Sequence, residues 1–404
     1  MNILKEELKK IKLSDKDYFE INQKSKAIIG SIKKELKKNK IKADVFLGGS
    51  FAKKTVMRKE KYDVDIFVRF DEKYGDDEIS NLLEKCLSGE RIHGSRDYFK
   101  IGDGNLTFEI VPVIKVSNPN KARNVTDLSF FHVSYVARAL KNKRVADEII
   151  LAKAFCYANN CYGAESYIKG FSGYALELLI IKYKSFLGFL KAVAKEDKQI
   201  ILDPAKHYKN KDEILLNLNE AKLNSPIVFV DPTNKNRNAL AALSFETFAR
   251  FREIARKFLK KPNNSFFAVK KINKNDFNLL IEAETDRQEG DIAGSKLLKY
   301  FNYLSSKIEK YFVIEKKQFE YTQKAEYYFK IKKKKELIFN GPKINDVFNV
   351  KKFKKKHKNC FVKKDRIYAK ENISISIDDI LNSDKKISRE MGITGLFKNS
   401  ALFS

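Results

Sequence analysis

Two aspartates separated by one residue restrict what this chain can fold into more than any other feature of the sequence. Asp63 and Asp65 lie in residues 62–70, YDVDIFVRF, where apolar and polar side chains alternate as in a half-buried strand. Side chains at positions i and i+2 of a strand point to the same face, about 6.5–7 Å apart. The segment therefore predicts a strand that turns two carboxylates to one face and alternate apolar residues, from Val64 to Val68, to the core.

Two like charges this close need a counter-charge, and carboxylate oxygens are ligands that Mg²⁺ prefers. A third carboxylate, Glu109, lies in residues 106–116, LTFEIVPVIKV, which form a second predicted strand. If the two strands are neighbours, Glu109 lies alongside Asp63 and Asp65. Three carboxylates on adjacent strands favour a site for two magnesium ions, one activating an attacking hydroxyl and the other holding a triphosphate.

A glycine pair precedes the aspartates. Gly48, Gly49 and Ser50 end a short predicted strand, and twelve residues separate Ser50 from Asp63. Glycine lets the backbone approach a phosphate closely, and serine can donate to a phosphate oxygen. The spacing of GGSFAKKT does not fit a P-loop. Taken separately, GGS is equally well a hairpin turn and DVD a surface strand, but together they favour metal-dependent nucleotidyl transfer.

The charge balance favours a polyanionic partner. The 404 residues include 81 Lys and Arg against 52 Asp and Glu, a formal net charge of +29, and 43% of them are hydrophobic. This apolar content excludes a disordered polyelectrolyte, and the positive surplus favours nucleic acid over an anionic membrane surface. A lysine-rich composition can also reflect codon bias, so the charge alone does not decide.

The sequence indicates neither a disulfide framework nor a membrane protein. The cysteines form no CxxC pair and no cluster with histidines, which predicts free thiols and no zinc site: Cys86, Cys156, Cys161 and Cys360. Residues 1–21 are charged throughout and lack the apolar core of a signal peptide. The longest apolar stretch, residues 171–190, is interrupted by Glu177, Lys182 and Lys184, which predicts a buried helix. We therefore expect a soluble, cytoplasmic protein without membrane contacts.

The chain divides into three predicted regions. Residues 1–125 combine amphipathic helices with a mixed sheet, and residues 126–260 are mainly helical. Residues 261–404 alternate strands and helices, beginning with a strand over 266–272 and ending in a short helix and a loose end. We predict an α+β multidomain fold without internal repeats.

The spacing of G-G-S and D-V-D resembles the signature of the polymerase-β-like nucleotidyltransferases. Four further blocks narrow this resemblance: residues 125–133, 151–186, 228–243 and 339–369. Together they are similar to the archaeal (class I) CCA-adding tRNA nucleotidyltransferases over residues 40–375. The resemblance implies a polymerase-β-like catalytic domain in 1–125, a helical nucleotide-recognition domain in 126–260, and body and tail domains in 261–404.

The resemblance also implies roles for individual residues. Asp63, Asp65 and Glu109 match the metal-binding catalytic carboxylates, which implies two Mg²⁺ ions; the family commonly has Asp at the third position. Seven residues match the contacts to the nucleoside triphosphate: Gly49, Ser50, Lys53, His132, Lys153, Tyr162 and Arg237. The family usually has Arg at the Lys53 position, and Arg237 matches the residue expected to select C or A by its base edge.

Four of these residues have ordinary structural interpretations when each is taken alone. His132 is more often a core histidine than a ligand, and Lys153 more often an ordinary charge at a helix rim. Tyr162 follows a predicted helix and can simply pack, and Arg237 can be a loop arginine. Their joint match to one family favours the functional interpretation.

A lysine-rich segment near the end is the predicted tRNA contact. Residues 351–370 carry ten Lys or Arg, three aromatic residues and the single acid Asp365. Such cations contact phosphates and such rings stack on bases, whereas the alternative is a solvated lysine-rich strand and loop. The resemblance places the segment in the tail domain that grips the tRNA elbow. The expected contacts are Lys351, Lys352, Lys354, Lys355, Lys356 and Lys358.

The activity implied by the resemblance is template-independent addition of CCA to the 3′ end of tRNA, with CTP and ATP as substrates and pyrophosphate released. A homodimer is one expected state. Two alternatives stay open. A related transferase, such as a poly(A) polymerase or an oligoadenylate or cyclic-dinucleotide synthase, would share GGS and DVD, and a non-catalytic tRNA-binding protein could use the same scaffold. The sequence also leaves open whether the chain adds CCA, CC alone or A alone.

Overall fold

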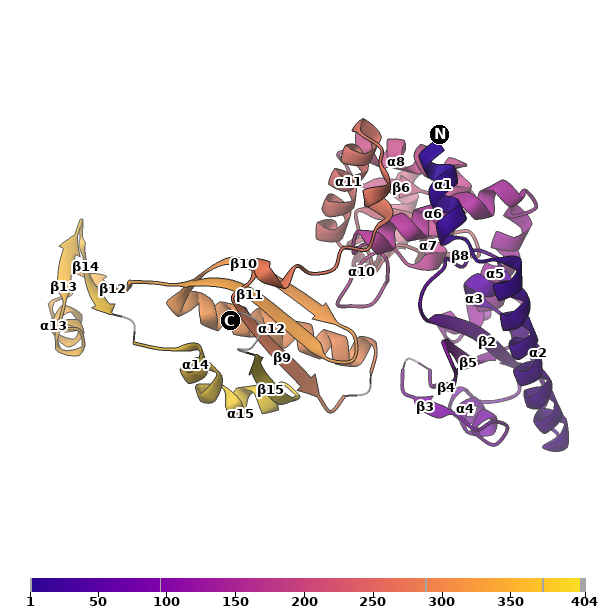
Figure 1. The fold of residues 1–404 in the computed structure, drawn as a ribbon, viewed down its shortest axis with the longest axis horizontal. Helices are drawn as coiled ribbons and strands as arrows, with labels where there is room; N and C mark the ends of the chain where they lie inside the picture. Colours follow the sequence, from indigo (N-terminus) through magenta and orange to yellow (C-terminus); the bar gives the residue numbers. More distant parts are fainter. Residues whose placement is uncertain (1, 95, 288, 373, 400–404) are drawn as a thin grey trace. The chain divides into compact units, whose positions relative to one another are not determined.

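The computed structural model describes residues 2–399 except residues 95, 288 and 373. The chain forms two compact units, Met1–Lys270 and Lys271–Ser404 (Figure 1). The first unit combines a mixed sheet with a helical region, and the second contains two further sheets. The predicted α+β multidomain class is confirmed, while the division at residues 125 and 260 stays a prediction.

A five-stranded sheet lies in the first unit. Its strand order is β1-β2-β5-β4-β3, with β2 and β5 parallel and the other neighbouring pairs antiparallel. The strands are β1 Ala43–Leu47, β2 Tyr62–Phe70, β3 Glu90–Ile92, β4 Tyr98–Asp103 and β5 Leu106–Ile114. This sheet contains both strands that were predicted from the acidic segments, and it places them side by side.

Alternation along β2 gives the sheet two different faces. The alternate residues from Val64 to Val68 are completely buried. They share one core with apolar residues of α2 (Asp15–Lys38) and α4 (Asp76–Glu84). Burying one such side chain contributes about 1.5–3 kcal/mol, which holds β2 firmly in this orientation. The two aspartates of β2 therefore lie on the face away from this core.

A helical region forms the rest of the first unit. Its helices are α1 Asn2–Ile11, α5 Ser129–Ala139, α6 Lys143–Ala158, α7 Gly173–Tyr183, α8 Phe186–Lys195, α9 Lys211–Asn217, α10 Glu220–Leu223 and α11 Phe245–Lys260. They surround a sheet of order β6-β7-β8, with β6 Ile200–Leu202, β7 Ile227–Asp231 and β8 Asn234–Asn238. Apolar residues of α1 pack against this core, so the first helix belongs to the helical region rather than to the five-stranded sheet. No helix within the described residues is long and apolar enough to cross a membrane.

The second unit is built on a four-stranded sheet of order β10-β11-β9-β15, with helix α12 sharing its core. Its elements are β9 Leu279–Thr285, α12 Asp291–Tyr311, β10 Phe312–Tyr321, β11 Ala325–Lys333, α14 Ile377–Ser383, α15 Lys385–Glu390 and β15 Ile393–Asn399. All neighbouring strands in this sheet are antiparallel.

Two expectations for this region are wrong. The strand expected over 266–272 is absent, and a 3₁₀ turn covers Asn264–Phe267 instead. The side chain of Asn263 accepts a hydrogen bond from the Ser265 backbone and so favours the turn over an extended chain. The expected loose end is also wrong as far as residue 399, because β15 pairs with β9.

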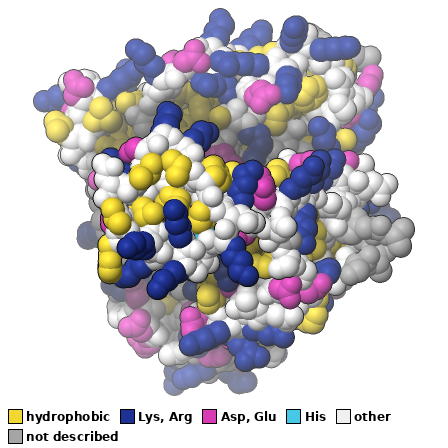
Figure 2. All heavy atoms as spheres, turned by 90° about the vertical axis from the view of Figure 1, so that its left-hand side faces the viewer, with side chains coloured by type: hydrophobic (Ala, Val, Ile, Leu, Met, Phe, Trp, Pro, Cys, Tyr) yellow, Lys and Arg dark blue, Asp and Glu magenta, His cyan; other side chains and the backbone are white. Residues whose placement is uncertain are grey.

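A small lysine-rich subdomain of the second unit, which we call the tail, contains β12 Glu336–Lys343, α13 Val347–Lys356, β13 Cys360–Lys363 and β14 Arg366–Asn372. The six lysines expected to contact tRNA are exposed, and five of them lie on α13. Exposed apolar side chains share this surface: Ile338, Val347, Phe348 and Val362. Figure 2 looks onto this end and shows apolar side chains surrounded by Lys and Arg. The first residues of the lysine-rich segment 351–370 therefore belong to a helix, whereas the alternative interpretation of this segment was a solvated strand and loop.

Candidate active site

The predicted metal-binding carboxylates lie on two neighbouring strands. In the parallel β2–β5 pair Asp65 is directly opposite Glu109, and Asp63 is opposite Thr107. On the other side of Glu109, β4 brings Lys100 opposite, with its Nζ 3.7 Å from Glu109 Oε1. The expectation that a neighbouring strand places Glu109 alongside the aspartates is therefore confirmed, while the roles of the three residues stay predictions.

The electrostatics of these carboxylates suit a cation. Burial, with repulsion from Asp63, raises the pKa of Asp65 to about 6 even though Lys53 opposes the shift. Burial and the two aspartates raise the pKa of Glu109 to about 7. An all-oxygen donor set of this kind fits a hard divalent ion. Among the residues described, no three acidic, His or Cys side chains form a ready-made ion cage, so a bound ion would take further ligands from substrate or water.

Gly49 explains why glycine precedes the acidic strand. Its φ is +57°, and a Cβ at this position would lie 1.6 Å from Asp65 Oδ2. The neighbouring Gly48 N–H donates to the Asp65 carbonyl oxygen at 2.8 Å. The glycine turn is thus held against the carboxylate strand, and it leads directly into α3 (Gly49–Ala52), which carries Ser50.

Lys53 and Lys153 meet at one buried carboxylate. Glu177 of α7 is completely buried, and its Oε2 accepts from Lys53 Nζ at 2.6 Å. Its Oε1 accepts from Lys153 Nζ at 2.8 Å and from Thr55 Oγ1 at 2.7 Å. Burial alone would raise the pKa of Glu177, but the two ammonium groups outweigh it and hold this pKa at about 2. Both predicted triphosphate contacts are therefore fixed in place by one residue.

His132 and Arg237 meet at a second buried carboxylate. Asp231, at the end of β7, is completely buried; Arg237 Nη1 lies 2.5 Å and His132 Nε2 3.2 Å from its Oδ2. Its Oδ1 accepts from Tyr174 at 3.0 Å and from Thr233 at 2.8 Å. Burial would raise the pKa of Asp231, but His132 and Arg237 hold it well below its usual range. Arg237 lies on β8 rather than in a loop.

One aromatic ring connects these two groups of residues. Tyr174 stacks on His132 with ring centres 4.0 Å apart. Lys53 Nζ lies 5.9 Å and the Arg237 guanidinium 5.7 Å from the centre of the same ring. Tyr162 approaches from the turn after α6, and an ideal Cβ on Gly173 would lie 3.0 Å from the Tyr162 hydroxyl and 3.7 Å from Lys153 Nζ. The structure thus places five of the seven predicted nucleotide contacts around Tyr174, Glu177 and Asp231: Lys53, His132, Lys153, Tyr162 and Arg237.

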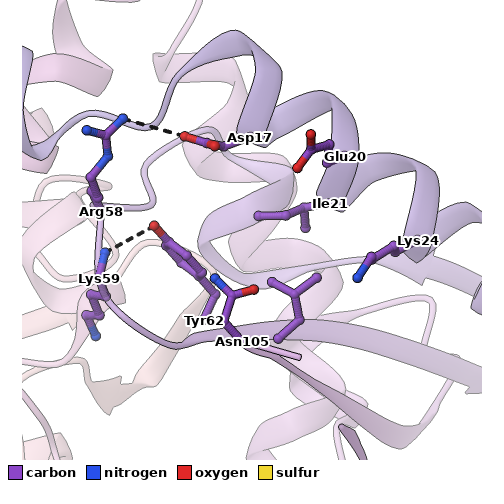
Figure 3. Close-up of a pocket in the computed structure, with 9 residues that line it drawn as sticks. Asp17, Glu20, Ile21, Lys24, Arg58, Lys59, Tyr62 and Asn105 are labelled. Carbon is purple, nitrogen blue, oxygen red and sulfur yellow. Dashed lines mark hydrogen bonds and ion pairs between the residues drawn. The ribbon is translucent and has the colours of Figure 1, made fainter. Parts of the chain in front are cut away.

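A cavity of about 310 Å³ opens elsewhere on the first unit, between α2 and the residues that lead into β2. Figure 3 shows Arg58 facing Asp17 across it, at 3.5 Å, and Tyr62 beside the backbone of Lys59. Its lining is Asp17, Glu20, Ile21, Lys24, Arg58, Lys59, Tyr62, Asn105 and Leu106. None of these residues was predicted to bind metal or nucleotide, so the sequence does not assign the active site to this cavity, although one of them, Lys59, also contacts the ring of Tyr162, a predicted nucleotide contact.

Comparison with known proteins places the first unit in a class. The family described as "Nucleotidyltransferase domain" matches residues 29–129, and that described as "tRNA nucleotidyltransferase, second domain" matches residues 147–268. A solved structure of Cid1, described by its RNA terminal uridylyl transferase activity, is 14% identical with a TM-score of 0.52, covering 67% of this chain and 98% of that one. A MgATP-bound structure of Cid1 poly(U) polymerase is 15% identical with a TM-score of 0.53, covering 66% and 98%. The matched families define a nucleotidyltransferase, and the solved structures share its fold.

Curated relatives narrow the class. The CCA-adding enzyme of Nanoarchaeum equitans is 37% identical over 354 residues, covering 83% of this chain and 86% of that protein. The CCA-adding enzyme of Methanocaldococcus jannaschii is 30% identical over 394 residues, covering 91% and 86%. The chain belongs to the CCA-adding enzyme family.

The raised pKa values of Asp65 and Glu109 predict pH-dependent metal binding. A cation binds the ionised carboxylates, so it must displace protons below about pH 7, and affinity for Mn²⁺ should rise between pH 6 and pH 8. Calorimetry in two buffers of different ionisation enthalpy should detect proton release at pH 6.5 and little at pH 8.5.

Without metal, the stability of the fold should depend on pH in the opposite direction. The folded state holds these protons more tightly than the unfolded state, so stability should fall as pH rises from about 4.5 to 7. Metal affinity that does not change with pH would contradict this account.

The buried cluster around Glu177 predicts a large stability effect. Glu177→Gln leaves two buried ammonium groups without their carboxylate, and breaking such a pair destabilises by about 3–5 kcal/mol. Thermal unfolding should show a clear drop in Tm. Glu253→Gln is the matched control, because Glu253 is exposed on α11 and pairs only with Lys257; its Tm should stay at the wild-type value. Equal Tm values for both variants would argue against the cluster.

Proposed function

We propose that this chain adds C, C and A to the 3′ end of tRNA, using CTP and ATP and releasing pyrophosphate. The observation that carries the proposal is the juxtaposition of Asp65 and Glu109 across β2 and β5, in a chain that aligns with CCA-adding enzymes over most of its length. The reaction is attack of the terminal RNA hydroxyl on the α-phosphate, with the bond to pyrophosphate breaking.

The chain's own residues position the substrate. Ser50 and the buried lysines Lys53 and Lys153 bind the triphosphate, with Tyr162 and His132 beside them. Because Glu177 and Asp231 already hold these side chains, little reorganisation is needed when the nucleotide arrives, and preorganised charge of this kind lowers the barrier. Arg237, held by Asp231, lies at the base end and selects cytosine and adenine by their hydrogen-bonding edges.

Asp63, Asp65 and Glu109 are the residues that would hold Mg²⁺, and we propose two ions. When bound, magnesium supplies the positive charge that offsets the carboxylates and the negative charge developing on the phosphate. Without a cation the raised pKa values of Asp65 and Glu109 leave part of this site protonated near neutral pH. Lys100, 3.7 Å from Glu109, offsets some of that charge from β4.

The tail supplies the second half of substrate binding. Its exposed lysines on and after α13 contact phosphates at the tRNA elbow, and nearby aromatic rings such as Phe348 are available for stacking. Contacts of this kind recognise shape rather than sequence, which suits a substrate pool that contains every tRNA. We place this activity in the cytoplasm and expect a homodimer, which light scattering of the purified chain tests.

The decisive assay supplies Mg²⁺ and tRNA transcripts that end before CCA, after C and after CC. Each is offered CTP, ATP, UTP or GTP singly and CTP with ATP, and products are sized to one nucleotide. We expect C, C and A in order and then a stop. Asp63→Ala and Asp65→Ala should abolish addition while tRNA binding stays nearly intact.

The other outcomes separate the alternatives. Long or unordered tails, or products made without tRNA, would assign the chain to a poly(A) polymerase or to an oligoadenylate or cyclic-dinucleotide synthase. Salt-sensitive tRNA binding with no incorporation would favour a non-catalytic tRNA-binding protein, and Glu109→Asp would then test whether the longer side chain is the cause. Addition of CC alone or A alone would define a partial activity.

The tail lysines predict a specific salt dependence. Changing Lys351, Lys352 and Lys355 together to Gln should weaken tRNA binding and reduce the slope of log affinity against log salt by about 2–3, because each lost phosphate contact lowers it by about 0.7–0.9. Addition at saturating tRNA should keep its rate. The matched control changes Lys33, Lys34 and Lys37 of α2, which are equally exposed. The same slope for both triple variants would remove the tail from the tRNA interface.

A further inference from the structure

Lys59 lies in the loop between α3 and β2, four residues before Asp63, and two tyrosine rings hold its ammonium group. Its Nζ lies 4.9 Å from the ring centre of Tyr157 and 5.2 Å from that of Tyr162. The two rings meet nearly edge to face, with centres 6.4 Å apart. A cation is attracted to the electron-rich faces of aromatic rings. The pair of rings therefore fixes the position of one positive charge beside the catalytic strand.

The charge on Lys59 has no direct counter-charge in the described part of the chain. No described carboxylate lies within ion-pair distance of its Nζ, and only its backbone N–H bonds to a neighbour, the Tyr62 hydroxyl, at 3.2 Å (Figure 3). Burial lowers the pKa of Lys59, and the more distant charges of Asp63 and Glu165 oppose that shift. Asp63 is a predicted metal ligand. A cation bound to Asp63 would offset its negative charge, so Asp63 would stabilise the charged form of Lys59 less. An anionic ligand would supply a direct counter-charge.

The surroundings of Lys59 contain more positive than negative charge. Lys153 is repelled by both Lys53 and Lys59, so the three ammonium groups are close enough to interact. Glu177 pairs with Lys53 and Lys153 and neutralises one charge. Three lysines and two glutamates, Glu177 and the more distant Glu165, leave a net positive charge on this side of the carboxylates. A net positive charge here favours an anionic ligand.

We propose that Lys59 is a further nucleotide-binding residue, whose ammonium group contacts the terminal phosphates of the incoming nucleoside triphosphate and the pyrophosphate that leaves. This inference rests on the proposed function, because it takes the nucleotide site to be the surface around Lys153. Tyr162 lies between Lys153 and Lys59. Its hydroxyl and Lys153 Nζ both lie near Gly173, and the ammonium group of Lys59 contacts its ring. An anion that extends from Lys153 past Tyr162 therefore reaches Lys59. The alternative ligand is a phosphate of the RNA 3′ end.

The test uses Lys59→Met, which keeps an unbranched apolar side chain one atom shorter over the rings and removes the charge, and Lys59→Arg, which keeps the charge. Lys61→Met is the matched control, since Lys61 is an exposed lysine in the same loop. Binding of CTP, CMP, inorganic pyrophosphate and tRNA to the full chain is measured with Mg²⁺ present, and the Tm of each variant is recorded. One hydrogen bond to a charged group is worth about 1.5–3 kcal/mol, or about 10- to 100-fold in affinity.

We expect Lys59→Met to weaken CTP and pyrophosphate binding by at least about 10-fold, with CMP and tRNA binding close to wild type and a lower Tm from the loss of the two ring contacts. Lys59→Arg should restore most of the loss, and Lys61→Met should behave as wild type. Unchanged pyrophosphate binding, or an equal loss for CMP and CTP, would overturn the proposal. Weaker tRNA binding alone would reassign Lys59 to the RNA end.

These results can be told apart from a failure of the proposed function. If the wild-type chain adds no CCA but binds pyrophosphate through Lys59, the contact stands and the assigned reaction fails. If the wild-type chain adds CCA and Lys59→Met binds CTP and pyrophosphate normally, the reaction stands and the contact fails.

Discussion

The parallel pairing of β2 with β5 is the constraint on which the rest of the site depends. It sets Asp65 opposite Glu109. Burial is the main cause that raises the pKa of each carboxyl group; repulsion from Asp63 adds to the shift of Asp65, and repulsion from both aspartates adds to that of Glu109. Like charges held this close are unfavourable unless a positive charge offsets them. The burial of alternate residues from Val64 to Val68 provides the free energy that keeps the carboxylates in this position.

On the basic side of the site, each of two buried acids pairs with two basic side chains. Glu177 pairs with Lys53 and Lys153, and Asp231 pairs with Arg237 and His132. Each acid makes burial of its partners tolerable, since an unpaired buried charge is strongly destabilising. The arrangement also leaves the bases oriented before any substrate is present. The same two carboxylates therefore stabilise the fold and hold the side chains that we propose as nucleotide contacts.

The sequence predicted that neighbouring strands bring Asp63, Asp65 and Glu109 together, but it did not predict the buried partners Glu177 and Asp231. Asp63 and Asp65 can be predicted from the alternation of apolar and polar residues around them. Glu177 pairs with Lys53, which lies 124 residues earlier in the chain, and no local pattern predicts that contact. Its signal was present, because a carboxylate inside an apolar helix must find a partner, but the sequence did not say which one. Arg237 shows a different limit: NKNRN has no strand propensity, and its pairing with β7 forms β8. The apolar pattern of residues 266–272 predicted a strand, but a turn capped by Asn263 forms at Asn264–Phe267 instead.

The order of strands in the second unit has a consequence for synthesis of the chain. Strand β9 lies in the middle of its sheet, yet one of its two neighbours, β15, is made of residues 393–399. Domains made first fold first as a chain emerges from the ribosome, so the nucleotidyltransferase unit can complete its core while one edge of β9 is still unpaired. That edge closes only after residues 393–399 have been made, so the pairing of β15 with β9 comes later than the pairing of β11 with β9.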